Sequence, residues 1–436
     1  MALPFVGRRQ PKKVAKIPTP GEVFTPRSAN VTSMYVERPA LEEALSGIFD
    51  SNEVRYLYGH SGSGKTWLYK NVFRNNDVYF YVVPLQELND GMSFDDLIRR
   101  QLGNLGVRSE SSTTNGLAAQ GGIGGIGASA AKATKSRPFE RAPLDLLLET
   151  IRRFASERRA VLVFENVERG VRRPDILHEL TKIIMSVDHD AFAAHDVRVL
   201  FVGTVKDLAI QISEMPDSAP ILNRLSMLPE VSRLSETEAR QLVEHGLFDL
   251  LQLEPVIDRT KLVRRALDRT DRLPLHIHTY CLEIAKSAIG RERRLDSAAE
   301  STGFHKWVDS KVAQYAERVF AHMNSKDTAL KVRTRVLFCI AKAQSSEFRS
   351  LDAKNLLDVE WPDLNASNAS VSAALNDLAG EAAKTKGRPD AILERVTRSG
   401  VHHYRFIDPV YRIAARNALK KNAMGEVERE ELLGEF

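Results

Sequence analysis

Cysteine is scarce in this sequence, which contains two in 436 residues. Cys281 and Cys339 lie far apart, each within a stretch of helical apolar spacing, so a disulfide framework and a four-cysteine metal site are both excluded. The chain also lacks any apolar run close to the roughly 20 residues of a membrane helix, and its first residues lack the apolar core of a signal peptide. We therefore expect a cytoplasmic protein that makes no membrane contact.

A large excess of one charge is absent too, because 62 Lys and Arg residues face 57 Asp and Glu residues and leave a net charge of +5. Residues 1–30 contain six basic residues and one acidic residue, and six minus one equals the whole excess. We interpret residues 1–30 as a basic flexible arm that is solvated. Nonspecific contact with DNA, or contact with an acidic partner, is the alternative for this arm.

What the chain does contain is a regular alternation of short apolar runs and amphipathic helices over residues 31–234. This alternation predicts an α/β domain with a mostly parallel sheet and crossover helices. Five strands are predicted, at 54–58, 78–83, 161–164, 198–203 and 227–233. A length of 436 residues leaves room for one or two further domains.

A glycine-rich insertion of about 104–138 separates the second predicted strand from the third. It has no charged residue from Asn115 to Ala131, and its glycines disfavour a stable helix. We expect a mobile loop here, with a segment that orders when a ligand or partner binds as the alternative.

From Ser235 onward the strand pattern stops. Ser235 and Glu238 have the spacing of a capping box, which predicts the start of a helix. The helical spacing that follows predicts an all-helical lid domain over residues 235–325.

The last part of the chain changes character again. Residues 326–421 combine three helical stretches with two strand-like runs around a Ser399–Gly400 turn. A final helix begins at Asp408–Pro409, with aspartate as the cap and proline in the first turn. This order predicts a winged helix-turn-helix domain, followed by an acidic tail at 422–436.

The chemistry begins at residues 59–66, which match the Walker A pattern in full and lie between a predicted strand and a predicted helix. The glycines let backbone N–H groups surround phosphates, Lys65 would reach the β and γ oxygens, and the Thr66 hydroxyl would bind Mg²⁺. The sequence itself does not distinguish ATP from GTP. The predicted nucleotide contacts in this segment are Gly59, His60, Ser61, Gly62, Ser63, Gly64, Lys65, Thr66 and Trp67.

An acidic residue suited to Mg²⁺ follows the third predicted strand. Glu165 comes directly after Val161–Phe164, where P-loop proteins usually carry aspartate, so Thr66 and Glu165 are the predicted metal ligands. Asn166 occupies the position at which hydrolytic members carry the acid that activates water, and an amide cannot act as a general base. Glu168 is the alternative base, or else a solvated loop charge. We expect strong nucleotide binding and slow turnover.

Residues 20–420 resemble a bacterial or archaeal ATPase of the STAND group, akin to the AAA+ initiators of the origin-recognition type. A full strand separates the Walker A strand from the Glu165 strand along the chain, as in the additional-strand class of P-loop ATPases. The resemblance implies a five-stranded parallel P-loop sheet followed by a helical lid and a winged helix. Besides Walker A, it rests on four stretches at 34–45, 199–204, 220–243 and 271–285.

This resemblance also implies roles for particular residues. ATP would be the nucleotide, with Tyr35 and Val36 against the adenine and Pro274 closing over the base. Thr204 would be the polar sensor of the γ-phosphate. Arg224 is the candidate for the arginine that such ATPases carry near their nucleotide, with Arg233 as the second candidate. His402 and His403 are candidates for a histidine of the winged helix that senses the phosphates.

The resemblance implies a switch: ATP sets a conformation that a separately encoded effector protein reads, as in bacterial anti-phage systems, and a homo-oligomer is an open possibility. Specific DNA reading is disfavoured because the expected recognition helix, 368–380, has no Lys or Arg and carries Asp377. The wing, 381–398, has five basic and three acidic residues, so nonspecific DNA contact stays open. The alternatives are a DNA-loading ATPase of the initiator or transposition type and a transcription regulator that binds ATP without using it.

Overall fold

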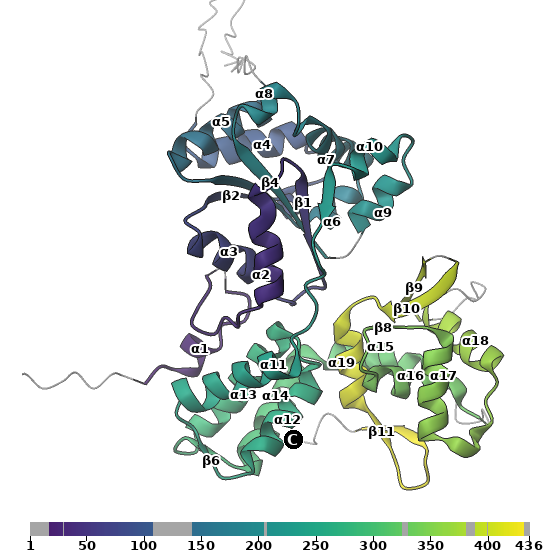
Figure 1. The fold of residues 1–436 in the computed structure, drawn as a ribbon. Helices are drawn as coiled ribbons and strands as arrows, with labels where there is room; N and C mark the ends of the chain where they lie inside the picture. Colours follow the sequence, from purple (N-terminus) through teal and green to yellow (C-terminus); the bar gives the residue numbers. More distant parts are fainter. Residues whose placement is uncertain are drawn as a thin grey trace, which may run out of the picture. The chain divides into compact units, whose positions relative to one another are not determined.

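The computed structural model describes residues 17–28, 30–107, 142–204, 207–324, 330–380, 389–398 and 400–430 (Figure 1). Most of the predicted basic arm, the glycine-rich insertion from residue 108, and Lys384, Lys386 and Arg388 of the wing lie outside these residues. The chain divides into two compact units. We call Arg38–Gly59 with Lys65–Val231 the sheet unit, and we call the remainder, which includes His60–Gly64 and everything from Ser232, the helical unit.

The sheet unit is built on a five-stranded parallel sheet with the order β2-β3-β4-β1-β5. Four of the predicted strands are confirmed, and a fifth strand forms near the predicted place. Strand β4 lies between β1 and β3, which is the predicted additional-strand order. The fifth strand lies earlier than predicted and shares only Met227 with the predicted range 227–233. The chain continues alongside β1 beyond it, since Leu228 N–H and Val231 N–H donate to the carbonyl oxygens of Tyr56 and Tyr58 at 3.1 Å and 2.8 Å. The strands are β1 Val54–Tyr58, β2 Tyr79–Pro84, β3 Ala160–Glu165, β4 Val197–Gly203 and β5 Leu225–Met227.

Both faces of this sheet are buried. Successive strand residues point to opposite faces. Tyr56 and Phe164 therefore pack in one core with α4 (Phe94–Asn104), α5 (Pro143–Ala155) and α7 (Pro174–Ser186). Leu57 and Val163 pack in a second core with α2 (Pro39–Ser46) and α3 (Lys65–Asn75). Short helices complete the unit: α6 Val167–Val171, α8 Asp190–Ala193, α9 Asp207–Ser213 and α10 Ser218–Leu222.

The first part of the helical unit is the predicted lid. The capping box is present: Ser235 N–H donates to Glu238 Oε2 at 2.7 Å, and Glu238 N–H donates to Ser235 Oγ at 3.2 Å. The only strands among the described residues of this lid are the two-residue β6 (Glu254–Pro255) and β7 (Arg294–Leu295). Its helices are α11 Glu236–Glu244, α12 Arg259–Thr270, α13 Pro274–Ile289, α14 Ser297–Lys311 and α15 Ala313–Ala321, with a π-helical turn at His245–Leu250.

The second part of the helical unit contains three helices, a small antiparallel sheet of order β8-β10-β9, and a last helix that Asp408 caps. This is the arrangement predicted for the winged helix. A further antiparallel pair, β11 (Leu419–Lys421) with β12 (Val427–Arg429), forms at the start of the predicted acidic tail. The other elements are α16 Val332–Lys342, β8 Glu347–Phe348, α17 Ser350–Glu360, α18 Asn368–Leu378, β9 Leu393–Arg398, β10 Val401–Phe406 and α19 Pro409–Ala418.

The predicted flexible arm is too long at its C-terminal end. Residues Pro20–Val23 form the short helix α1, and Thr19 N–H donates to Glu22 Oε2 at 2.7 Å. Val23 and Phe24 are buried, because apolar side chains gain more from burial than the chain loses by ordering. No helix among the described ranges has the length and apolar character to cross a membrane.

Candidate nucleotide site

The Walker A segment leaves β1 and opens α3 as the sequence predicts. Gly59 N–H donates to the carbonyl oxygen of Thr204 at 3.2 Å, and Lys65 Nζ donates to the carbonyl oxygen of Gly59 at 2.7 Å. Gly62 and Gly64 have φ values of 78° and 97°, which side chains rarely adopt. These two glycines let the backbone form the turn that a phosphate cradle needs.

Thr66 and Glu165, the two predicted metal ligands, lie together in the sheet unit. Thr66 Oγ1 donates to Glu165 Oε1 at 2.9 Å. Tyr69 OH donates to the same oxygen at 3.0 Å. The sequence analysis missed Tyr69, although helical spacing places residues three apart on one face of α3. Burial, together with the charge of Glu165, raises the pKa of the Tyr69 hydroxyl, so it stays protonated and acts as a donor.

Lys65 is surrounded by carboxylates. Burial lowers the pKa of its ammonium group to about 8, and the negative charges of Glu168, Glu165 and Glu230 oppose this shift. At neutral pH most of the lysine therefore remains charged. Glu230, which follows β5, is a second residue that sequence reasoning did not connect with this site.

Asn166 and Glu168 point to different places. Asn166 has left-handed backbone angles (φ 59°, ψ 45°), and its Nδ2 donates to Gln86 Oε1 at 2.6 Å. Glu168 Oε2 instead accepts a hydrogen bond from Thr204 N–H at 3.2 Å. Thr204 and Glu168 therefore lie together at the end of β4, and Glu168 is the largest electrostatic influence on Lys65.

The structure places Arg224 in an ion pair. The Arg224 Nε donates to both carboxylate oxygens of Asp188, at 3.0 Å (Oδ1) and 2.9 Å (Oδ2). The Arg224 side chain is 31% exposed. The partner of Arg233 is Asp271, in the helical unit. His402 Nδ1 lies 2.9 Å from Thr397 Oγ1 on the β9–β10 hairpin.

The other predicted contacts divide between the units. Trp67 is half-buried in the first turn of α3, in the sheet unit. Tyr35, Val36 and Pro274 belong to the helical unit, as do residues His60–Gly64.

Pro274 opens α13, and the next residue contacts the Walker A turn. Leu275 N–H donates to the carbonyl oxygen of Gly62 at 3.2 Å. A Cβ on Gly62 would lie 2.8 Å from the Cβ of Leu275, so this position requires glycine for space as well as for its φ. The lid helix and the tip of the phosphate loop thus form one packed contact within the helical unit.

The Tyr69→Phe variant should weaken Mg²⁺ binding at this site by about 10-fold to 100-fold, because a hydrogen bond to a charged group is worth about 1.5–3 kcal/mol and each 1.4 kcal/mol is about tenfold. The Glu165 side chain is one methylene longer than that of aspartate and has one more rotatable bond. The hydrogen bond from Tyr69 OH restricts the rotation of its carboxylate. Mg²⁺ titrations of the ATP complex would measure the loss. Tyr81→Phe removes a hydroxyl that donates to Gln101, so Mg²⁺ affinity should stay within about twofold in this control. Equal Mg²⁺ affinity in both variants would exclude the positioning role.

The comparisons with known proteins concern the family of the sheet unit and the fold of the chain. Residues 50–209 match the AAA domain family. The comparison with curated proteins gives no match. Among solved structures, the chain is similar to a Walker-type ATPase of Pyrococcus abyssi, with 11% identity, coverage of 88% of this chain and 96% of that chain, and a TM-score of 0.52.

Two further solved structures are similar over most of the chain. The ORC1 protein of Aeropyrum pernix, solved in complex with DNA, has 12% identity, coverage of 92% of this chain and 96% of that chain, and a TM-score of 0.45. CDC6 of Pyrobaculum aerophilum has 14% identity, coverage of 91% of this chain and 96% of that chain, and a TM-score of 0.45. At these identities, the likeness concerns the fold alone.

Proposed function

We propose that this protein binds ATP with Mg²⁺ and acts as a slow switch, since residues 50–209 match the AAA domain family. The bound nucleotide sets the conformation of the helical unit, and a separately encoded effector or regulatory protein reads that conformation. This is the mode of action of STAND ATPases, which the sequence resembles.

The residues of the sheet unit fit Mg–ATP. The Thr66 hydroxyl and the Glu165 carboxylate are hard oxygen ligands, and their oxygens lie 2.9 Å apart. Among the described residues, no three His, Cys, Asp or Glu side chains gather to hold a metal ion by themselves. This fits Mg²⁺, which usually takes one or two protein oxygens together with water and phosphate oxygens. When bound, the ion would neutralise charge on the β- and γ-phosphates.

Within this proposal, each side chain has a defined task. Lys65 supplies a positive charge to the phosphates from a buried position. Thr66 and Glu165 orient the metal, and Tyr69 orients Glu165. Thr204 lies at the end of β4, in contact with Glu168, where it would sense the γ-phosphate.

Slow turnover rests on one observation above all: the Asn166 side chain is an amide and is hydrogen-bonded to Gln86. Hydrolysis needs a base within reach of the attacking water. Glu168 is the remaining candidate, but its carboxylate accepts a hydrogen bond from Thr204 N–H. To act as a base, Glu168 would have to give up the hydrogen bond from Thr204 and bind the attacking water instead. This requirement favours retention of ATP over turnover.

The DNA-loading alternative is less well supported. It needs an arginine that reaches the nucleotide of a neighbouring subunit, and Arg224 is engaged by Asp188 with both oxygens. The helix α18 carries no Lys or Arg, so it lacks the cationic side chains that contribute most to the affinity for DNA phosphates. An effector protein is therefore the preferred partner.

Hydrogen exchange of the full chain with ATP, with ADP and without nucleotide tests the switch. ATP should change the protection of α13 and α19 in the helical unit, and the Lys65→Ala variant should not respond. If ATP binds to the wild-type protein and the exchange of the helical unit stays the same, the switch proposal fails.

A further inference from the structure

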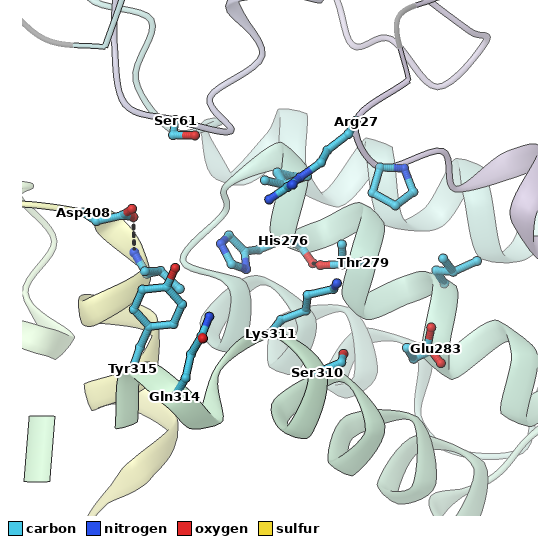
Figure 2. Close-up of a pocket in the computed structure, with 14 residues that line it drawn as sticks. Arg27, Ser61, His276, Thr279, Glu283, Ser310, Lys311, Gln314, Tyr315 and Asp408 are labelled. Carbon is cyan, nitrogen blue, oxygen red and sulfur yellow. Dashed lines mark hydrogen bonds between the residues drawn. The ribbon is translucent and has the colours of Figure 1, made fainter. Parts of the chain in front are cut away.

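A cavity of about 520 Å³ lies within the helical unit, between α13, the junction of α14 and α15, and the start of α19 (Figure 2). This volume is in the usual range for small-molecule sites. Of the Walker A residues only Ser61 lines the cavity, at its edge. The cavity thus shares Ser61 with the Walker A segment, and its other lining residues lie outside that segment.

Two cationic side chains enter this cavity without partners. Figure 2 shows that Arg27 extends toward His276 from one side and that Lys311 extends toward Thr279 from another. Within the described parts of the chain, neither Arg27 nor Lys311 makes a hydrogen bond or an ion pair. Two unpaired cations at one cavity attract an anion.

His276 adds a polar group that lacks a partner. Its Nδ1 is buried and has no hydrogen-bond partner among the described residues. Burial lowers the pKa of His276 to about 4; the charge of Asp271 opposes this shift, and the charges of Arg27 and Lys311 add to it. The imidazole is therefore neutral near pH 7. A buried polar group without a partner is unfavourable and calls for an explanation such as a bound ligand.

The two carboxylates at the cavity are already engaged. Glu283 Oε1 accepts a hydrogen bond from Lys286 Nζ at 2.7 Å. Asp408 Oδ1 caps α19 by accepting from Val410 N–H at 2.9 Å, and burial raises the pKa of Asp408. Neither carboxylate forms an ion pair with Arg27 or Lys311, so the positive charge is available.

We propose that this cavity binds a phosphorylated, hydroxyl-rich small molecule with the size of a nucleoside monophosphate or a sugar phosphate. Arg27 and Lys311 hold the phosphate, since guanidinium and ammonium groups are the usual protein ligands of phosphate. Gln314 and Tyr315, which line the cavity beyond Lys311 at the start of α15, meet the hydroxyl groups. This site does not depend on the Walker A site or on the proposed switch.

Isothermal titration of the full chain with AMP and with ribose 5-phosphate tests this assignment. The titrations use the Lys65→Ala variant to weaken the Walker A site, and the charge reversal at Lys311 below shows which of the remaining binding belongs to the cavity. At least one probe should bind at or below about 1 mM, equivalent to about 4 kcal/mol. Binding of both probes would indicate recognition of the sugar phosphate, and binding of AMP alone would indicate that the base is read as well.

Adding Lys311→Glu to this variant should weaken binding by about tenfold or more, because it reverses a charge at the phosphate. Adding Lys306→Glu changes an exposed residue of the same helix that does not line the cavity, so affinity should stay within about twofold. Thermal unfolding of each protein checks that it is folded, and Arg27→Glu replaces Lys311→Glu if the latter is not. Absence of binding by both probes, equal affinity after charge reversal, or binding only when Lys65 is present would overturn the proposal.

Discussion

The Lys65→Ala variant should lose affinity for Mg–ATP by about 100-fold or more. Lys65 is the buried cation of the site, and Glu165, Glu168 and Glu230 act on it electrostatically. Without the lysine, these carboxylates would face the phosphates without compensation. Truncating one partner of a buried charge pair costs about 2–5 kcal/mol, and about 2.8 kcal/mol corresponds to 100-fold.

Equilibrium titration with Mg–ATP measures this loss. Lys70→Ala is the matched control, because Lys70 lies on the same helix one and a half turns further on, and its affinity should stay within about threefold. Wild-type affinity should also fall as the pH rises above about 8, where Lys65 becomes neutral, whereas a Lys65→Arg variant should lack this fall. Normal ATP binding by Lys65→Ala would refute the assignment of the site.

The Asp271→Asn variant should destabilise the helical unit by about 3 kcal/mol. The Asp271 side chain is 5% exposed and forms ion pairs with three guanidinium groups. These belong to Arg233, to Arg412 at 3.5 Å and to Arg416 at 3.4 Å. Arg412 also donates to the carbonyl oxygens of Ala341 and Ser345, both at 3.1 Å. Removing the only carboxylate in this set leaves buried cations facing one another.

Urea denaturation followed by tryptophan fluorescence measures this change. Trp307 and Trp361 lie in the helical unit, so a Trp67→Phe background makes the signal specific for that unit. Asparagine tolerates the left-handed backbone of residue 271 (φ 48°), so the variant tests the charge rather than the conformation. The exposed control Asp309→Asn should stay within about 0.5 kcal/mol of wild type. Equal stability of both variants would mean that carbonyl groups alone satisfy the arginines.

This ion-pair cluster bears on the proposed switch. Asp271 lies three residues before Pro274, which opens α13, and Arg412 and Arg416 lie on α19. Asn417 Nδ2 also donates to the carbonyl oxygen of Arg269 at 2.9 Å. We infer that a nucleotide-dependent movement of α13 would be transmitted to the winged helix through these bonds.

Local signals in the sequence were sufficient for most of the fold. The first predicted strand, 54–58, coincides with β1, because the Walker A glycines mark its end. Two helix starts were predicted from short-range hydrogen-bonding patterns. One is the capping box at Ser235, and the other is the aspartate–proline pair at 408–409. The β11–β12 pair was missed because its strands are three residues each and follow a helical pattern.

The details of the site were harder to predict, because they depend on backbone angles and on distant partners. The backbone of Asn166 is left-handed, and its side chain donates a hydrogen bond to Gln86. The Glu168 carboxylate instead accepts a hydrogen bond from Thr204 N–H. The Arg224–Asp188 pair joins residues 36 apart, and no local pattern signals it. Tyr69 could have been found, since it follows Thr66 by one helical turn. The adenine contacts implied for Tyr35, Val36 and Pro274 stay predictions.

The most direct test of the slow switch is the fate of bound ATP. The protein is loaded with Mg–ATP, separated from free nucleotide, and sampled over time for bound ATP and ADP. Because Asn166 cannot act as a base, we expect ATP to persist with a turnover slower than about one per minute, below the usual range of enzymes. Steady hydrolysis at about 1 s⁻¹ or faster would contradict the account.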